Sequence, residues 1–296
     1  MDARGRGTLL LIACAAALPA CRGGGEGSGD GKIPDGPAPS YADVAAAYNA
    51  RVARLEAIQG TLDLVVTGTD KDGRAQKDQG EGNLTFVRPG KVALRVDKVS
   101  QTYFWLGSDD EKFWWFDLRG EEKVAVVGAH ASATPDQAAH LGLPVHPLDL
   151  LELAGVVPLA EEARGTPHWA PGGSVVVDLP GRWGVRRLTI EPKSGEARAV
   201  ELLDSAGGVV VRSELSRYET VPVRGDAAAT PRVATRLVAR LPSNGASVEL
   251  VLHGLKNPGA DRIKPGNFDY ADLKGRFAIT REVDAAELGH AREGSP

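Results

Sequence analysis

The spacing of apolar residues changes once, near residue 60, and this change divides the chain into two kinds of structure. Between residues 41 and 59 the apolar positions recur every three or four residues, as on one face of a helix. These positions are Val44, Tyr48, Val52, Leu55 and Ile58. The spacing predicts one amphipathic helix over 41–59, with Arg51 and Arg54 on its opposite side and Gly60 at its end.

From Thr61 onward, apolar and polar residues alternate in short segments, which is typical of strands with one buried face. The segments are five to eight residues long and are separated by turn-forming residues such as Pro-Gly, Ser-Asp-Asp and Arg-Gly. Connections this short leave no room for crossover helices, so neighbouring strands should run antiparallel. About six strands are expected before residue 134 and about six after residue 157.

The segment 134–157 interrupts this alternation. Its residues Leu148, Leu151 and Val156 follow a helical spacing, and two short helices are expected there. The predicted fold is mainly β with a helical lid (α+β): one strongly curved antiparallel sheet, covered by the N-terminal helix and the two short helices. A sheet of about eleven or twelve strands must curl, and helices over the mouth of a curled sheet enclose a cavity.

The first 40 residues lie outside this pattern. Arg4 and Arg6 precede an apolar stretch from Thr8 to Ala20, of about 13 residues. This stretch is too short to span a hydrocarbon core of roughly 30 Å. It therefore predicts a signal peptide over residues 1–20 rather than a membrane helix.

The end of this stretch predicts lipid attachment at Cys21. Residues 18–21, Leu-Pro-Ala-Cys, resemble the bacterial lipobox, so we expect cleavage before Cys21 and a covalent diacylglycerol and N-acyl chain on it. Cys14, the second of the two cysteines, lies in the expected signal peptide, which leaves no internal disulfide. Two or more acyl chains anchor a protein stably. The alternative is an ordinary signal peptide cleaved after Ala20, with a free cysteine.

Composition divides the remaining chain into three expected parts. Residues 21–40 are rich in Gly, Pro and Ser and should form a flexible tether. The domain should span 41–280, and a charged, disordered tail should span 281–296. A formal net charge of −4 argues against a nucleic-acid partner.

The sequence holds no local motif of a serine hydrolase, a zinc protease or a redox enzyme. The spacing of His130, His140 and His146 matches no common zinc pattern. The protein is therefore predicted not to be an enzyme and to use no metal or other cofactor. A hydrolase with carboxylates far apart in the sequence remains an alternative, because such carboxylates have no local signature.

Aromatic residues gather in two adjacent predicted strands: Tyr103, Phe104, Trp105, Phe113, Trp114, Trp115 and Phe116. Because successive side chains of a strand point to opposite faces, both faces of these strands should be covered. One face would pack on helices, and the other would line a groove or belong to a filled core.

Arg88 shares a predicted strand face with Leu84 and Phe86. A guanidinium on an apolar face needs hydrogen-bond acceptors. Carbonyls of the helical lid near Leu148 and Leu151 would supply them. The alternative is an arginine that extends to solvent at the end of its strand.

The order of these features resembles the periplasmic lipoprotein-carrier family and its lipid-anchored outer-membrane receptor (LolA/LolB-like). The resemblance rests on the segments NARVARLEAIQGTLDLVV, GEGNLTFVRPGKVALRV and SDDEKFWWFD, and it extends more loosely to Tyr270. It implies an incomplete barrel whose concave apolar face receives acyl chains under a lid of helices, with Arg88 holding the lid. Where the receptor has an exposed aliphatic hook, the corresponding turn offers only Val99.

The resulting hypothesis is a lipid-anchored protein on the periplasmic face of the cell envelope that binds acyl chains of lipids or lipoproteins. Arg22 rather than Asp after Cys21 favours the outer membrane. Expected protein partners are a periplasmic carrier or a membrane protein. The alternative is an envelope sensor or protein-interaction module that uses the same fold without a lipid ligand. The expected groove residues are Leu64, Leu84, Phe86, Arg88, Trp105, Trp114 and Trp115, and the expected lid residues are Leu148 and Leu151.

Overall fold

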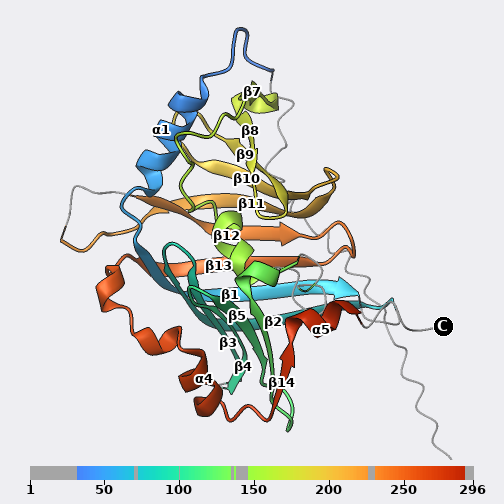
Figure 1. Cartoon of the computed structure of the whole chain (residues 1–296). Coiled ribbons are helices and arrows are strands. Elements are labelled where there is room, and N and C mark those ends of the chain that lie inside the picture. The colour runs from blue at the N-terminus through green and yellow to red at the C-terminus, as the bar shows by residue number, and fades with distance from the viewer. Residues whose placement is uncertain are drawn as a thin grey trace, which may run out of the picture.

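The computed structural model describes residues 32–69, 73–99, 101–134, 137, 146–225 and 231–290. The expected signal peptide, Cys21, most of the expected tether and His140 lie outside these residues. The described residues form one strongly curved sheet of 14 strands that does not close into a barrel (Figure 1). The prediction of a mainly β, incomplete barrel with a helical lid is confirmed, with a few more strands than expected.

Two meanders build the sheet and meet in its middle. The strand order is β14-β6-β5-β4-β3-β2-β1-β13-β12-β11-β10-β9-β8-β7, so the first and last strands of the main fold pair with each other. All neighbours are antiparallel except β14, which runs parallel to β6. The first meander comprises β1 (Ala57–Thr69), β2 (Ala75–Val87), β3 (Lys91–Lys98), β4 (Gln101–Ser108), β5 (Lys112–Asp117) and β6 (Val124–Ala129). The second comprises β7 (His168–Trp169), β8 (Val175–Pro180), β9 (Gly184–Ile190), β10 (Ala197–Asp204), β11 (Val209–Thr220), β12 (Arg232–Arg240) and β13 (Ser247–Lys256).

This topology explains where the lid must lie. Because β6 and β7 stand near opposite ends of the sheet, the chain between them has to cross it. The described part of the crossing includes η2 (Pro147–Asp149) and α3 (Leu150–Leu153), drawn in green over the middle of the sheet in Figure 1. We call the face that carries α1 and α3 the inner face, and the opposite face the outer face.

Helix α1 (Tyr41–Val52) begins at Ser40, whose side chain accepts a hydrogen bond from the Asp43 amide. It ends seven residues before the predicted limit, and Ile58 already lies in β1. The apolar spacing predicted a longer helix because Leu55 and Ile58 would be buried in a helix and are also buried in the observed turn and strand. From Ala57 the backbone instead pairs with β2.

Each face of the sheet has its own apolar core. The larger core on the inner face joins α1 and α3 to both meanders. A smaller core on the outer face packs Trp105, Trp114 and Phe116 against Leu273 of α4 (Tyr270–Arg276). The apolar residues of α4 thus cover the aromatic strands on this face.

The chain beyond residue 280 does not begin as the expected tail. Residues Arg281–Asp284 form β14, and Ala285–His290 form α5. Strand β14 pairs with the free edge of β6, and Ala285 is fully buried beside Phe113. A strand at the edge of a sheet is held by main-chain hydrogen bonds and needs few apolar side chains, so the charged composition of 281–284 did not indicate a strand.

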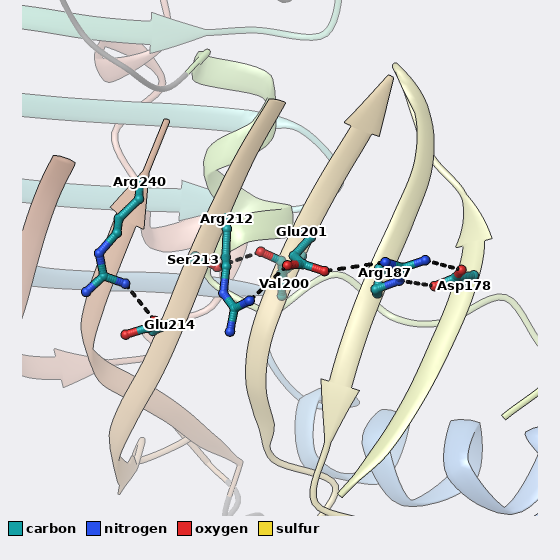
Figure 2. Close-up of polar contacts among 8 residues, drawn as sticks. All are labelled: Asp178, Arg187, Val200, Glu201, Arg212, Ser213, Glu214 and Arg240. Atoms are coloured by element: carbon teal, nitrogen blue, oxygen red, sulfur yellow. Dashed lines mark hydrogen bonds and ion pairs between the residues drawn. The ribbon is translucent and has the colours of Figure 1, made fainter. Parts of the chain in front are cut away.

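The outer face of the second meander carries charges of alternating sign (Figure 2). Asp178, Arg187, Glu201 and Arg212 lie on successive strands, with ion-pair distances of 2.7, 3.8 and 3.1 Å between neighbours. Arg240 of the next strand, β12, pairs at 2.6 Å with Glu214 of β11. These side chains are partly exposed, so each pair adds little stability, and this half of the outer face is in contact with solvent.

Arg51 fixes α1 to the rest of the fold, although the helical spacing placed it on the polar side. Its guanidinium donates to three main-chain carbonyls: Gly155 at 2.5 Å, Gly195 at 2.9 Å and Arg232 at 2.9 Å. It lies over the rings of Tyr48 and Tyr218 at 4.6 and 5.5 Å. Only 6% of the residue is exposed.

Replacing Arg51 by Met should lower the free energy of unfolding by about 3 kcal/mol or more, because charged hydrogen bonds contribute roughly 1.5–3 kcal/mol each and are not additive. Urea unfolding of the full chain measures this. Arg198→Met is the matched control, since Arg198 is exposed on β10; its effect should stay within about 0.5 kcal/mol. Equal losses in the two variants would contradict the role given to Arg51.

Candidate ligand-binding site

The lid is held firmly on its C-terminal side. The fully buried Ser213 of β11 donates its hydroxyl to the Leu153 carbonyl at 2.7 Å. Tyr48 of α1 donates to the Gly155 carbonyl at 2.6 Å, the same oxygen that Arg51 reaches. Asn49 exchanges two hydrogen bonds of 2.8 Å with the Leu159 main chain. These bonds fix the C-terminal end of α3 above the sheet.

Between α3 and the sheet lies a narrow apolar slit. Both meanders and α3 contribute to it, and the space between the side chains is about 430 Å³ including the open mouth. The enclosed part holds about one water molecule. Every lining residue but one is apolar: the lining is Leu64, Leu94, Phe104, Leu106, His146, Leu150, Leu153, Leu237, Val248 and Leu250.

His146 is the one polar lining residue, and it is 1% exposed. Its Nδ1 accepts a hydrogen bond from the Leu148 amide at 3.2 Å, which caps η2. Its ring packs edge-on against Phe113 and Trp183, with centroids 4.3 and 5.6 Å apart. Burial, assisted by the charge of Arg182, lowers the pKa of His146 to about 3, so the ring is neutral at pH 7.

Asp149 is a second buried ionisable group in the lid, 3% exposed. Both of its carboxylate oxygens accept from Trp183 Nε1, at 2.9 and 3.0 Å. Burial raises the pKa of Asp149 to about 7; the Trp183 bond and Arg182 oppose the rise, and Glu152 adds to it. At neutral pH this carboxyl is therefore partly protonated.

The structure brings only some of the predicted groove residues to the inner face. Leu64 lines the slit. Leu84, Phe86 and Trp115 are buried in the inner core around it, and Trp115 stacks on Phe104 at 5.2 Å between ring centroids.

Trp105 and Trp114 lie on the outer face, contrary to the prediction. Trp105 contacts Phe277 and Trp114 contacts Tyr270, with ring centroids 5.5 and 5.6 Å apart. The reason is strand alternation: Leu106 and Trp115 form one cross-strand pair, so their neighbours in sequence face the other way.

The two predicted lid residues are buried but do not line the slit. Leu148 packs with Phe113 and Ala285, and Leu151 lines a small pocket beside Arg88. The slit is closed instead by Leu150 and Leu153. In a helix of four residues the spacing does not identify which side faces the sheet. The strand residues of the lining that the sequence analysis did not predict face the slit for the same reason as Leu64, because alternate residues of a strand share one face. They are Leu94, Phe104, Leu106, Leu237, Val248 and Leu250.

Arg88 is half-buried and donates through Nη2 to the Val52 carbonyl at 2.8 Å. This carbonyl belongs to the C-terminal end of α1, whereas the described lid carbonyls receive Ser213, Tyr48 and Arg51. Burial lowers the pKa of Arg88, and Glu56 opposes this. The structure therefore joins Arg88 to the end of the N-terminal helix, whereas the sequence analysis expected a bond to the lid near Leu148 and Leu151.

The described residues contain no group of three or more His, Cys, Asp or Glu side chains that could hold a metal ion. Within the same part of the chain, no helix has the length and apolar character needed to cross a membrane. The site is thus an apolar slit with one neutral imidazole, covered by the short helix α3.

No protein-family model matches the chain, and no curated protein matches its sequence. Solved structures do match. A LolA superfamily protein from Nitrosomonas europaea superposes with a TM-score of 0.52 at 9% identity, covering 79% of this chain and 99% of the other. The chain has the fold of the LolA superfamily. The resemblance predicted from the sequence is confirmed as a likeness of fold.

A second structure extends the LolA-like fold to another group. A DUF1329 family protein from Desulfovibrio piger has a TM-score of 0.51 at 12% identity and covers 78% of this chain and 99% of its own. Both matches span nearly all of the other protein and about four fifths of this chain. The slit lies on the inner face of this LolA-like sheet.

The buried Asp149 predicts a pH-dependent stability. Its pKa rises from 3.8 to about 7 on folding, so the stability it contributes is full below about pH 4 and is lost as the pH rises through 7. Asp149→Asn carries no charge at any pH. Between pH 5 and pH 8, the free energy of unfolding of the variant should gain roughly 1–3 kcal/mol relative to the unmodified chain.

Urea unfolding at the two pH values measures this gain. His146 titrates with the opposite sign: its pKa falls from 6.5 to about 3 on folding, so its contribution is present above pH 6.5 and is lost as the pH falls through 3. The contribution of His146 is the same in the unmodified chain and in Asp149→Asn, so it cancels when their free energies of unfolding are subtracted. A difference between the two proteins that is constant from pH 5 to pH 8 would show that Asp149 does not titrate as inferred.

Proposed function

We propose that this protein is a lipid-anchored periplasmic binding protein that holds acyl chains of lipids or lipoproteins in the slit under α3, in lipid or lipoprotein trafficking. The observation that carries the proposal is the lining of the slit, in which all side chains but His146 are apolar. Such a lining favours a hydrocarbon chain over any charged or strongly hydrated ligand. It offers no nucleophile or carboxylate pair, which supports binding rather than catalysis.

The closed slit is too small for an acyl chain, so binding requires the N-terminal end of α3 to move. Each methylene that leaves water contributes about 0.8 kcal/mol, and a chain of ten would offset the loss of the contacts that Leu150 makes with the sheet. The bonds at Leu153, Gly155 and Leu159 provide a fixed end about which the rest of the lid turns. The fold supports this reading, because the carrier family that the sequence resembles receives acyl chains on the same concave face.

A protein-interaction or sensor role is the second candidate. The narrowness of the closed slit favours this role, because side chains already fill most of the space under α3 and no ligand is needed to fill it. An apolar docking surface, however, has little support among the described residues, whose exposed large apolar side chains are Ile33 and Val99. Binding of an acyl probe separates the two candidates.

Replacing Leu64 by Gln should weaken acyl binding at least tenfold. A neutral amide in the slit keeps its hydrogen bonds to water only when no chain is bound, and burying it without a partner is unfavourable. Displacement of a fluorescent acyl probe from the full chain carrying Cys21→Ala measures the affinity. Circular dichroism and thermal unfolding show whether the variant is folded.

Val65→Gln is the matched control, because the next residue of β1 lies on the outer face. Val65→Gln introduces the same side chain into the same strand but on the opposite face, so it should change probe affinity by no more than about twofold. If Leu64→Gln does not fold, Leu64→Phe fills the slit without adding polarity and should weaken binding as well. Failure of the unmodified chain to bind the probe would overturn the proposal.

The lipid anchor is a separate part of the proposal, motivated by the lipobox-like residues 18–21. Cys21→Ala should move the protein from the membrane fraction to the soluble fraction and leave the free energy of unfolding of the domain unchanged. Fractionation of cells followed by a high-salt wash measures this. Retention of the variant on the membrane after the wash would show that Cys21 is not the anchor.

A further inference from the structure

His146 carries its proton on the nitrogen that has no protein partner. The Leu148 amide donates to Nδ1, so Nδ1 must present its lone pair. The ring is neutral, and a neutral imidazole keeps one hydrogen. That hydrogen is therefore on Nε2.

Nε2 is buried and has no hydrogen-bond partner among the described residues. A buried donor left without an acceptor costs about 1–3 kcal/mol. The edge-on contact with Phe113, at 4.3 Å between centroids, replaces only a small part of a hydrogen bond. His146 thus combines two properties: it lines an otherwise apolar slit, and its Nε2 is a buried N–H donor without an acceptor.

We infer that the slit selects acyl chains that carry an uncharged carbonyl, as in an ester or an amide, and that His146 Nε2 donates a hydrogen bond to this carbonyl. The inference rests on the proposed function and names its ligand class. Membrane glycerolipids and acylated lipoproteins both present such carbonyls at the head of their acyl chains, so the recognised chemistry is common to both.

The surroundings of His146 favour a neutral acceptor over a carboxylate. The lining contains no cation, and a neutral imidazole offers a single donor. Removing a carboxylate from water costs far more than one neutral hydrogen bond returns. A plain hydrocarbon, in contrast, would leave the donor without an acceptor. An ester or amide matches both the apolar wall and the one polar group.

The test is competition against a bound fluorescent acyl probe in the full chain carrying Cys21→Ala. Three competitors have similar lengths: methyl dodecanoate with an ester, tridecane with no acceptor, and dodecanoate with a charge. The ester should compete about tenfold better than the hydrocarbon, and the carboxylate should compete less well than the ester. His146→Asn is the decisive variant, because Asn can still accept from the Leu148 amide but is too short to reach the position of Nε2.

In His146→Asn the preference for the ester over the hydrocarbon, taken as the ratio of their competition constants in the same variant, should fall to less than threefold. His146→Phe should give the same loss and excludes an effect of the cap. Equal competition by ester and hydrocarbon in the unmodified chain would overturn the inference and leave the apolar slit intact. Stronger competition by dodecanoate would overturn it in favour of a charged ligand. Failure of probe and competitors alike to bind would overturn the proposed function itself.

A second arm identifies the source of the carbonyl. Native mass spectrometry follows retention of a diacyl phosphatidylethanolamine or a triacylated lipopeptide by the same full chain. Retention of one of them, reduced in His146→Asn, supports the inference and shows which molecule supplies the ester or amide. Equal retention by the unmodified chain and His146→Asn would contradict recognition by Nε2.

Discussion

The contact on which the arrangement depends most is that of the Arg51 guanidinium with three main-chain carbonyls. Gly155 lies just after α3, Gly195 lies between β9 and β10, and Arg232 begins β12, so one side chain joins segments that are far apart in the sequence. A buried cation with too few acceptors would be very costly. The three segments must therefore assemble together, and their assembly sets the position of α3 and the width of the slit.

The architecture could be predicted from the sequence to a large extent, because the period of the apolar residues reports on backbone type. The two meanders and the helical interruption follow from that period. The face of the sheet that a residue occupies was harder to predict. Trp105 and Trp114 belong to runs of aromatic residues, in which the side chains on the two faces are equally apolar. Arg51 lies next to Val52, and spacing alone placed its guanidinium in solvent, whereas the fold surrounds it with carbonyls supplied by distant segments.

The candidate site was predicted by its character and only partly by its residues. Leu64 was found because it lies on an alternating strand. Leu150 and Leu153 were missed because a four-residue helix has no recognisable period, and His146 because a single histidine gives no signal before its neighbours are known. Arg88 was expected to bind carbonyls of the lid near Leu148 and Leu151, but it binds the Val52 carbonyl of α1, because which carbonyls lie within its reach depends on tertiary distances.

The charged ladder on the outer face, from Asp178 to Arg212, has a consequence for how the sheet assembles. A strand displaced by two residues keeps its apolar side chains on the inner face, so the hydrophobic core discriminates only weakly against this error. The same displacement would move Arg187 away from both Asp178 and Glu201 and place charges beside groups that do not match them. These ion pairs add little to the stability of the native fold, but they favour the native strand register over a register shifted by two residues.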